Sequence, residues 1–430
     1  KNFIKKIIFK ITKKKQTIKD SSAKIAVAYN EGIDLDKRSD LFWLKNSKIN
    51  PNDIILYFEY RGQLNRHGKK EDLLRNIKKL GIQAINLWEY DNVLEVDFLN
   101  ELITKLESLE FPDSEEKFLR KISLELINKF KYWYLFFKKF NIKIHMDAKD
   151  FGQDVIIKYL ALYKLDGCSL GKLKSHVEEC LADAPPPINA CNIFFVPNKD
   201  SAERLKNYTI NKFQYMIING NPYNPFTENN ISEINEIKNF FSDNKKNFIV
   251  LLLDAGHSEN KNNYHQSMTT DSLYNFYCIF FDALSKIDGI GVIIKNKRIR
   301  HLKNLKDIYA KVLDFQRKGV CYVVKDPFQR MPSLYASITN FVVAVYPGYP
   351  SPLMECVLSK KRGVFYDLVN LKSVEKEWYK WGENKVIFKN IDEMLKKIIE
   401  LKKNKLNSKY FGDWSDQKDL LDPYQDNLGS

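Results

Sequence analysis

Short apolar runs alternate with helix-length segments along most of the chain. In the first half these runs lie at residues 24–29, 53–58, 82–87, 142–146, 193–196 and 216–218. Short apolar runs bounded by polar segments are typical of strands buried on both faces of a sheet. Because helical patterns separate most of them, the first half is predicted to form a parallel α/β sheet.

The second half repeats the same order of elements. Its apolar runs lie at residues 248–253, 291–294, 320–324, 341–345, 363–366 and 385–388. Helical patterns separate them at residues 273–285, 305–317, 332–337, 352–358 and 391–402. This half is therefore predicted to be a second doubly wound parallel sheet.

A turn-forming sequence separates the two series. Asn219-Gly220-Asn221-Pro222 follows the last run of the first series, and the chain of 430 residues is long enough for two or three domains of about 150 residues. The predicted parts are a basic amphipathic segment (1–20), a first domain (21–222) with a helical insertion (about 96–140), a linker (223–247), a second domain (248–405) and a tail (406–430).

The stretch behind the run at 341–345 carries the most specific pattern. Ser351 is expected at the N-cap of a helix, Pro352 at its first position, and Glu355 is expected to complete a capping box. A helix N-terminus at the carboxyl end of a parallel strand is also where phosphate and ribose groups bind. Both interpretations stay open: an ordinary helix start, or a nucleotide site in which Ser351 meets phosphate and Glu355 the ribose.

The Ser351-x-x-x-Glu355 helix start resembles that of GT-B glycosyltransferases of bacterial surface-polysaccharide (capsule and lipopolysaccharide) biosynthesis. The resemblance implies two Rossmann-like doubly wound sheets that face a central cleft, with the acceptor on the first and the nucleotide-sugar donor on the second. Lys295-Asn296-Lys297 is similar to a Lys-x-Lys that follows the second strand of the donor domain in such enzymes. Its alternative is a solvated basic turn.

Polar residues that follow the predicted strands are the candidate site residues, because ligands bind beyond the carboxyl ends of parallel strands. In the second domain the candidates for donor binding are Ser351, Glu355, Lys295, Lys297, Asp254, His257 and Ser258. A sugar transferase also needs a carboxylate that takes the acceptor proton or acts as nucleophile. In the first domain Glu59, Asp147 and Glu31 are candidates for that role, and Arg61 for acceptor binding.

Several other chemistries lack their motifs. The sequence contains no GxGxxG, GxxxxGK[ST], GxSxG or HExxH pattern, and its six histidines show no ligand spacing, so no metal and no bound cofactor are expected. The six cysteines have no CxxC spacing and are predicted to be thiols in a reducing cytoplasm. Zinc-finger and RNP patterns are absent, so nucleic acid is not an expected partner.

The net charge of +15 favours anionic partners such as nucleotide phosphates or lipid headgroups. Residues 1–19 hold eight lysines around an apolar stripe of Phe3, Ile4, Ile7, Ile8 and Ile11. This segment is predicted to bind the anionic cytoplasmic face of the inner membrane; a helix docked on the protein, or a linker, is the alternative. Because the sequence begins with Lys1, we expect it to be part of a longer protein.

These observations predict a glycosyltransferase that moves a sugar from a UDP-, CMP- or GDP-activated donor onto a surface glycan or lipid-linked acceptor. Three alternatives within the same fold stay open: a CDP-polyol phosphotransferase, a nucleotide-sugar epimerase, and a non-catalytic module that binds a glycan or a partner protein.

Overall fold

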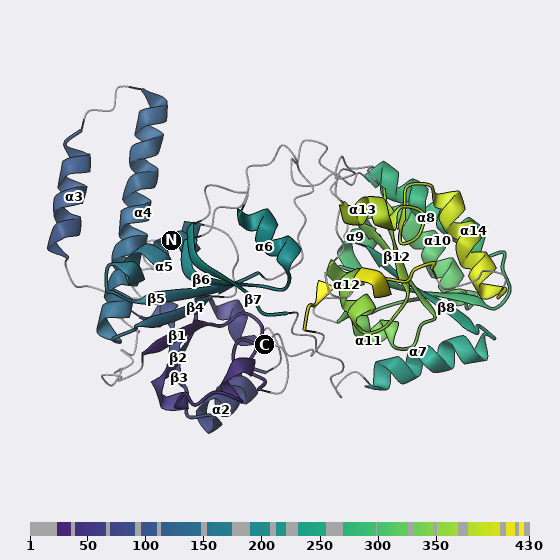
Figure 1. The fold of residues 1–430 in the computed structure, drawn as a ribbon, viewed down its shortest axis with the longest axis horizontal. Coiled ribbons are helices and arrows are strands. Elements are labelled where there is room, and N and C mark those ends of the chain that lie inside the picture. Colours follow the sequence, from purple (N-terminus) through teal and green to yellow (C-terminus); the bar gives the residue numbers. More distant parts are fainter. Residues whose placement is uncertain are drawn as a thin grey trace, which may run out of the picture. The chain divides into compact units, whose positions relative to one another are not determined.

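The computed structural model describes residues 24–35, 39–65, 69–90, 96–109, 113–147, 153–173, 190–206, 212–220, 231–254, 270–297, 299–325, 331–346, 351–368, 377–404, 410–417 and 421–424. These residues fall into two compact units, one up to Asn219 and one from Gly220 onward (Figure 1). The predicted amphipathic segment at 1–20 lies outside the described residues. No helix of the described part is long and apolar enough to cross a membrane.

The first unit is built on a seven-stranded sheet with the order β3-β2-β1-β4-β5-β6-β7. Its strands are β1 (Ile25–Ala28), β2 (Ile54–Phe58), β3 (Gln83–Asn86), β4 (Ile144–Asp147), β5 (Cys168–Lys172), β6 (Ala190–Val196) and β7 (Lys212–Ile218). All the pairings between them are parallel. Its helices are α2 (Lys70–Lys79), α3 (Asp97–Glu107), α4 (Ser114–Lys139), α5 (Gln153–Tyr163) and α6 (Lys199–Lys206).

Alternate residues of the central strand β2 face different helices. In β2, Ile55 and Tyr57 pack with aromatic residues of α4, whereas Leu56 and Phe58 pack in a separate cluster with Ile77 of α2. Successive side chains of a strand point to opposite faces, so both faces are apolar and both are covered. The strand must therefore be apolar along its length, which is why the sequence pattern reveals it.

The second unit is built on a six-stranded sheet with the order β10-β9-β8-β11-β12-β13, also parallel throughout. Its strands are β8 (Phe248–Asp254), β9 (Ile290–Asn296), β10 (Cys321–Val323), β11 (Phe341–Tyr346), β12 (Gly363–Asp367) and β13 (Ile387–Phe388). Its helices are α7 (Ile231–Asp243), α8 (Thr270–Leu284), α9 (Ile299–Asn304), α10 (Lys306–Arg317), α11 (Pro332–Ala336), α12 (Ser351–Leu358), α13 (Glu377–Gly382) and α14 (Ile391–Lys402).

Two apolar clusters cover the two faces of this second sheet. Val250 and Leu252 of β8 pack with α8, α10 and α14, while Leu251 and Leu253 pack with α7, α11 and α12. Two parallel α/β sheets in series, each covered by helices, confirm the predicted GT-B fold class. The predicted cleft between the sheets stays a prediction.

Five features differ from the sequence prediction. The strand β5 (CSLGK) was not predicted, because Ser169, Gly171 and Lys172 interrupt its apolar pattern. Part of the segment predicted as a linker forms α7, whose residues Ile237 and Phe241 are buried against the second sheet. A 3.6-residue apolar spacing therefore lies within a segment whose overall composition is polar.

The helical insertion packs on a face of the first sheet, where the prediction placed it at the edge. Trp133, Phe136 and Phe137 in the second half of α4 join the cluster that includes Ala26 and Tyr57 of the central strands. The first half of α4 runs beyond the sheet beside α3 (Figure 1), and Phe118 and Leu119 there are exposed.

The predicted capping box at α12 is wrong. The helix begins at Ser351 itself, and Glu355 stands four residues further on, whereas a capping box joins residues three apart. Glu355 therefore does not form the predicted capping box with Ser351.

The predicted polar tail contributes apolar residues to the second unit. Phe411 stacks on Phe341 of β11 with ring centroids 4.8 Å apart, and the buried Trp414 donates its indole N–H to the Gly363 carbonyl at 2.9 Å. These few apolar residues are embedded in an aspartate-rich sequence whose average composition hides them.

Candidate functional site

In each unit, polar side chains gather where the parallel strands end. The first unit has Asn30 and Glu31 beyond β1, Glu59 beyond β2 and Asp147 at the end of β4. Each of three polar residues lies two positions after a residue on one face of the sheet: Asn30 after Ala28, Glu59 after Tyr57 and Asp147 after His145. Ala28 and Tyr57 pack against α4 and α5, so the three polar side chains lie on that same face.

Lys158 of α5 joins two of the predicted catalytic carboxylates. Its Nζ atom lies 2.6 Å from Glu59 Oε1 and 2.6 Å from Asp147 Oδ2. The side chains of Lys158, Asp147 and Glu59 are 1%, 4% and 17% exposed, so Glu59 is the most accessible member. Asn30 Nδ2 also lies 3.4 Å from Asp147 Oδ1.

Aromatic rings and a buried histidine complete the surroundings of Lys158. The ammonium group lies 4.6 Å from the centroid of the Trp133 ring and 5.5 Å from that of Tyr57. The Tyr57 hydroxyl lies 2.8 Å from His145 Nε2. Burial disfavours the charged form of Lys158, but Asp147, Tyr57 and Glu59 together outweigh burial, so the pKa of Lys158 lies well above its usual value.

Sequence reasoning did not identify Lys158. It lies inside the otherwise apolar pattern of α5, between Ile157 and Leu162, both of which are buried. A lysine on the apolar face of a helix is the signal that could have identified it, because such a residue is buried only when it is paired.

The third predicted carboxylate, Glu31, forms a separate ion pair. Lys172 at the end of β5 lies 2.9 Å from Glu31, with both side chains partly exposed. The structure therefore brings Glu59 and Asp147 together through one lysine and leaves Glu31 to a different one.

A buried aspartate holds the loop that carries Glu31. Asp40 Oδ2 accepts hydrogen bonds from the backbone N–H groups of Asn30, Glu31 and Gly32 at 2.7, 2.7 and 3.1 Å. Gly32 has φ +115°, a conformation that side-chain-bearing residues rarely adopt. Burial raises the pKa of Asp40 to about 6 even though the backbone N–H groups lower it.

Gln63 fixes the backbone at Glu59. Its Oε1 accepts the N–H groups of Glu59 and Tyr60 at 2.6 and 3.2 Å, and its Nε2 donates to the Tyr29 carbonyl at 2.5 Å. Gln63 is 1% exposed, so this link between the ends of β1 and β2 is shielded from water. Arg61, predicted to bind the acceptor, lies exposed in the same turn of 3-10 helix.

In the second unit, Asp254 belongs to a buried network at the ends of β8 and β9. Asp254 Oδ2 accepts hydrogen bonds from the Tyr277 hydroxyl and from Asn296 Nδ2, both at 2.5 Å. All three residues are at most 2% exposed. Asn296 Oδ1 is buried with no hydrogen-bond partner in the described part of the chain, which leaves an acceptor open beside the network.

Lys295 lies on the opposite face of β9, in phase with Ile293 and on the side covered by α12. It is 8% exposed. Burial lowers the pKa of Lys295, while Glu355, Cys356 and Asp254 act in the opposite sense. Lys295 and Glu355 are thus close enough to interact electrostatically, although 60 positions separate them along the chain.

The remaining donor-binding candidates are less enclosed or lie elsewhere. Lys297 is exposed and donates its backbone N–H to the Asp254 carbonyl at 3.2 Å, and Ser351 is half-buried at the start of α12. His257 and Ser258 lie outside the described residues. Within the described ranges there is no group of three His, Cys, Asp or Glu side chains placed to hold a metal.

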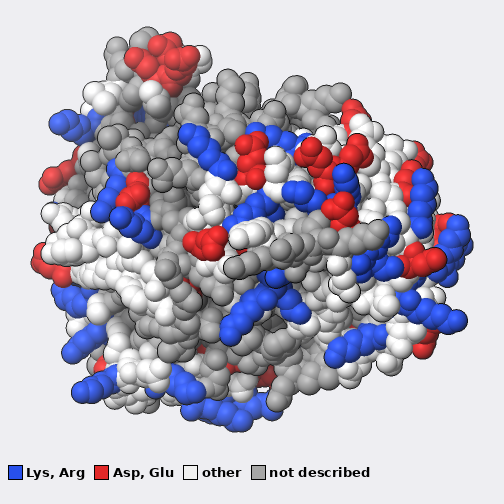
Figure 2. Space-filling model, turned by 45° about the vertical axis from the view of Figure 1, so that its right-hand side comes forward, with Lys and Arg blue, Asp and Glu red and all other residues white. Residues whose placement is uncertain are grey.

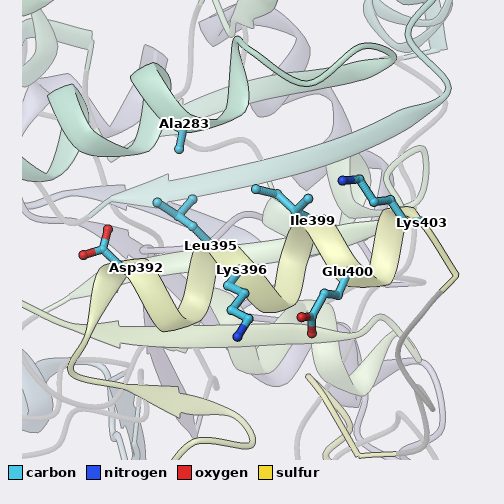
Figure 3. A pocket seen from close by; sticks show the side chains of 7 residues that line it. All are labelled: Ala283, Asp392, Leu395, Lys396, Ile399, Glu400 and Lys403. Carbon is cyan, nitrogen blue, oxygen red and sulfur yellow. The ribbon is translucent and has the colours of Figure 1, made fainter.

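Two surface features do not contain the candidate residues. A depression of about 480 Å³ runs along α14 beside α8, where Leu395 and Ile399 point towards α8 and Lys396 and Glu400 point away (Figure 3). Figure 2 shows basic and acidic side chains interspersed on the face in view. On that face the excess of positive charge is not concentrated in one described patch.

No protein-family model matches the chain, and no curated protein sequence matches it. Among solved structures, S. aureus MnaA with UDP is similar over 95% of this chain and 93% of that one, at 11% identity and a TM-score of 0.53. Anabaena HepE with UDP and glucose is similar over 94% and 97%, at 9% identity and a TM-score of 0.48. The wall teichoic acid polymerase TagF is similar over 100% and 94%, at 11% identity and a TM-score of 0.47. At these identities the MnaA likeness shows the shared two-sheet fold alone.

The raised pKa of Asp40 predicts a pH-dependent contribution to stability. The folded protein holds the Asp40 proton more tightly than the unfolded chain, in which the pKa of this carboxyl is 3.8. The contribution of Asp40 to the free energy of unfolding therefore increases as the pH falls from 7 to 5. A shift to about 6 corresponds to a gain of about 1.3 kcal/mol over that window. Asp40→Asn should lose this gain in urea unfolding measured at both pH values.

Asp34→Asn is the matched control, because Asp34 is an exposed carboxylate of the same loop. The comparison uses the difference between the two pH values, so the titration of other groups cancels. Equal differences in wild type and Asp40→Asn would show that Asp40 stays ionised throughout the window.

Proposed function

We propose that this protein is a glycosyltransferase that uses a nucleotide-activated sugar and a glycan or lipid-linked acceptor. The observation that carries the proposal is the buried Lys295, which lies at the carboxyl edge of the second sheet within electrostatic range of Glu355. A buried cation and a carboxylate near the first turn of a helix suit a phosphate and the hydroxyls of a ribose. The MnaA structure, which shares the fold, holds UDP.

In the proposed donor site, Lys295, Lys297 and the first N–H groups of α12 bind the phosphates, together with Ser351. Glu355 accepts hydrogen bonds from the ribose hydroxyls. Asn296 Oδ1, the buried acceptor beside Asp254, accepts one further hydrogen bond from the ligand. His257 and Ser258 stay candidates for the same site.

In the proposed transfer step, Glu59 takes the proton of the acceptor hydroxyl. The acceptor oxygen then forms the new bond to the sugar, and the nucleotide leaves with the electrons of the broken bond. Glu59 fits this role better than Asp147, because it is 17% exposed whereas Asp147 is 4% exposed and in contact with both Lys158 and Asn30. Arg61, exposed two residues further on, is proposed to contact the acceptor.

The donor site predicts nucleotide binding that depends on Glu355. At a concentration about 100 times its dissociation constant, the preferred nucleotide among UDP, CMP, CDP and GDP should add about 2.7 kcal/mol to the free energy of unfolding. Glu355→Gln should weaken that nucleotide by about tenfold to a hundredfold, because a hydrogen bond to a charged group is lost. Isothermal titration and melting temperature are measured together.

Lys396→Met is the control, since Lys396 is an exposed lysine on the outer helix α14. Unchanged nucleotide affinity in a folded Glu355→Gln variant would remove Glu355 from the site. Binding of a nucleotide without sugar transfer would favour an epimerase or a non-catalytic module, and transfer of a polyol phosphate would favour the CDP-dependent alternative.

The transfer step predicts that Glu59→Gln lowers kcat by about 10²-fold to 10⁴-fold, the usual contribution of a positioned proton acceptor. The glutamine keeps an oxygen that can accept from Lys158, so nucleotide affinity and melting temperature should change little. Glu31→Gln, which alters the neighbouring ion pair, should reduce kcat far less. Equal losses in the two variants would contradict the assignment to Glu59.

We further propose that residues 1–19 attach the protein to an anionic membrane surface at the cytoplasmic face of the inner membrane. The support is their eight lysines and apolar stripe, since each basic residue near such a surface contributes about 1 kcal/mol. Deleting residues 1–19 should abolish co-sedimentation with vesicles that contain phosphatidylglycerol. Undiminished co-sedimentation of the shortened protein would assign membrane binding elsewhere.

A further inference from the structure

We infer that Lys158 is a positioning residue for Glu59: its buried ammonium group holds one carboxylate oxygen of Glu59 in place for proton transfer. The inference rests on the proposed function, because it gives Glu59 the role of proton acceptor. It adds a residue that lies between the two carboxylates and is itself closed off from solvent.

The geometry leaves Lys158 little freedom. Its ammonium group contacts Glu59 Oε1 and Asp147 Oδ2 at the same distance, 2.6 Å, and lies against the Trp133 and Tyr57 rings. Hydrogen bonds between charged groups at such distances are the strong ones. The backbone of Glu59 is held independently by Gln63, so both ends of the Glu59 residue are fixed.

The burial of Lys158 is not explained by stability alone. An ion pair removed from water loses hydration that its attraction only partly restores, and well-packed apolar residues often stabilise a core equally well. An apolar residue would fit the apolar face of α5, where Ile157 and Leu162 are buried. Buried charged groups with strongly shifted ionisation are concentrated at functional sites, and this one lies at the carboxyl edge of a parallel sheet.

The charges around Lys158 define what it does. Two carboxylates, Glu59 and Asp147, face one ammonium group, and the Tyr57 ring, whose hydroxyl lies 2.8 Å from His145 Nε2, is also near it. Removal of the ammonium would leave two carboxylates close together in a poorly hydrated place. Such pairs cannot both stay ionised, so one of them takes up a proton at a higher pH.

The test follows the charge of Glu59 directly. In protein labelled with ¹³C at the glutamate side-chain carboxyl, the Glu59 signal is identified by its loss in Glu59→Gln, and its pH midpoint is compared between wild type and Lys158→Met. We expect the midpoint to move upward by at least one pH unit. The acid limb of the pH profile of kcat/KM should move in the same direction, which a merely structural role would not produce.

Two further variants keep the inference falsifiable. The double variant Lys158→Met/Asp147→Asn removes both the ammonium group and the second carboxylate charge, and it is used if Lys158→Met alone does not fold. We expect the Glu59 midpoint in the double variant to be higher than in Asp147→Asn alone. Lys172→Met is the matched control, because it removes the partner of Glu31 and should leave the Glu59 midpoint unchanged.

The outcomes separate the two proposals. An unmoved Glu59 midpoint in a folded variant overturns the role of Lys158, and so does the failure of both Lys158 variants to fold, which would assign the lysine to the core alone. If Lys158→Met moves the Glu59 midpoint but the wild-type protein transfers no sugar, the control of Glu59 by Lys158 is supported and the proposed function is overturned.

Discussion

Burial of parallel strands on both faces is the constraint on which this structure depends. Helices cover the faces of the central strands, so a polar side chain inside such a strand needs a buried partner, as His145 and Ser169 have, and most of the candidate polar groups lie where the strands end. Val250 to Leu253 are almost fully buried, and the next residue, Asp254, is the first polar one. Chemistry in such a fold is confined to the carboxyl edges by the same requirement that makes the core.

The two edges satisfy their buried polar groups in different ways. The first unit holds a cation between carboxylates, with Lys158 as the common partner of Glu59 and Asp147. The second unit separates its polar groups by strand phase, so that Asp254 and Asn296 face α8 while Lys295 faces α12. A network in which Tyr277 and Asn296 donate to the Asp254 carboxylate therefore lies on one side of β9, and Lys295, within electrostatic range of Glu355, lies on the other.

The polar groups at these edges also fix backbone, which is the condition for holding a ligand in one geometry. Asp40 accepts hydrogen bonds from three consecutive backbone N–H groups after β1, and Gln63 accepts two after β2. Both side chains are buried, so their hydrogen bonds do not compete with water. The loops that carry Glu31 and Glu59 are thereby fixed from inside the unit.

The sequence by itself determined most of the strands and helices, because burial on both faces makes most strands short apolar runs that can be recognised locally. It also indicated which polar residues lie at or just beyond the ends of the strands, among them Glu59, Asp147, Asp254 and Lys295. Where local composition was mixed, as in the strand β5 and the helix α7, the same reasoning failed.

Only the tertiary structure decided which of those residues meet. Lys158 is 99 positions from Glu59, and Glu355 is 60 positions from Lys295, so their proximity depends on strand order and helix packing. Strand order has no counterpart in the local pattern, because an apolar run indicates a buried strand without indicating which strand lies beside it. The chemistry of an edge residue could therefore be proposed from the sequence, but its partner and its charge were decided by the fold.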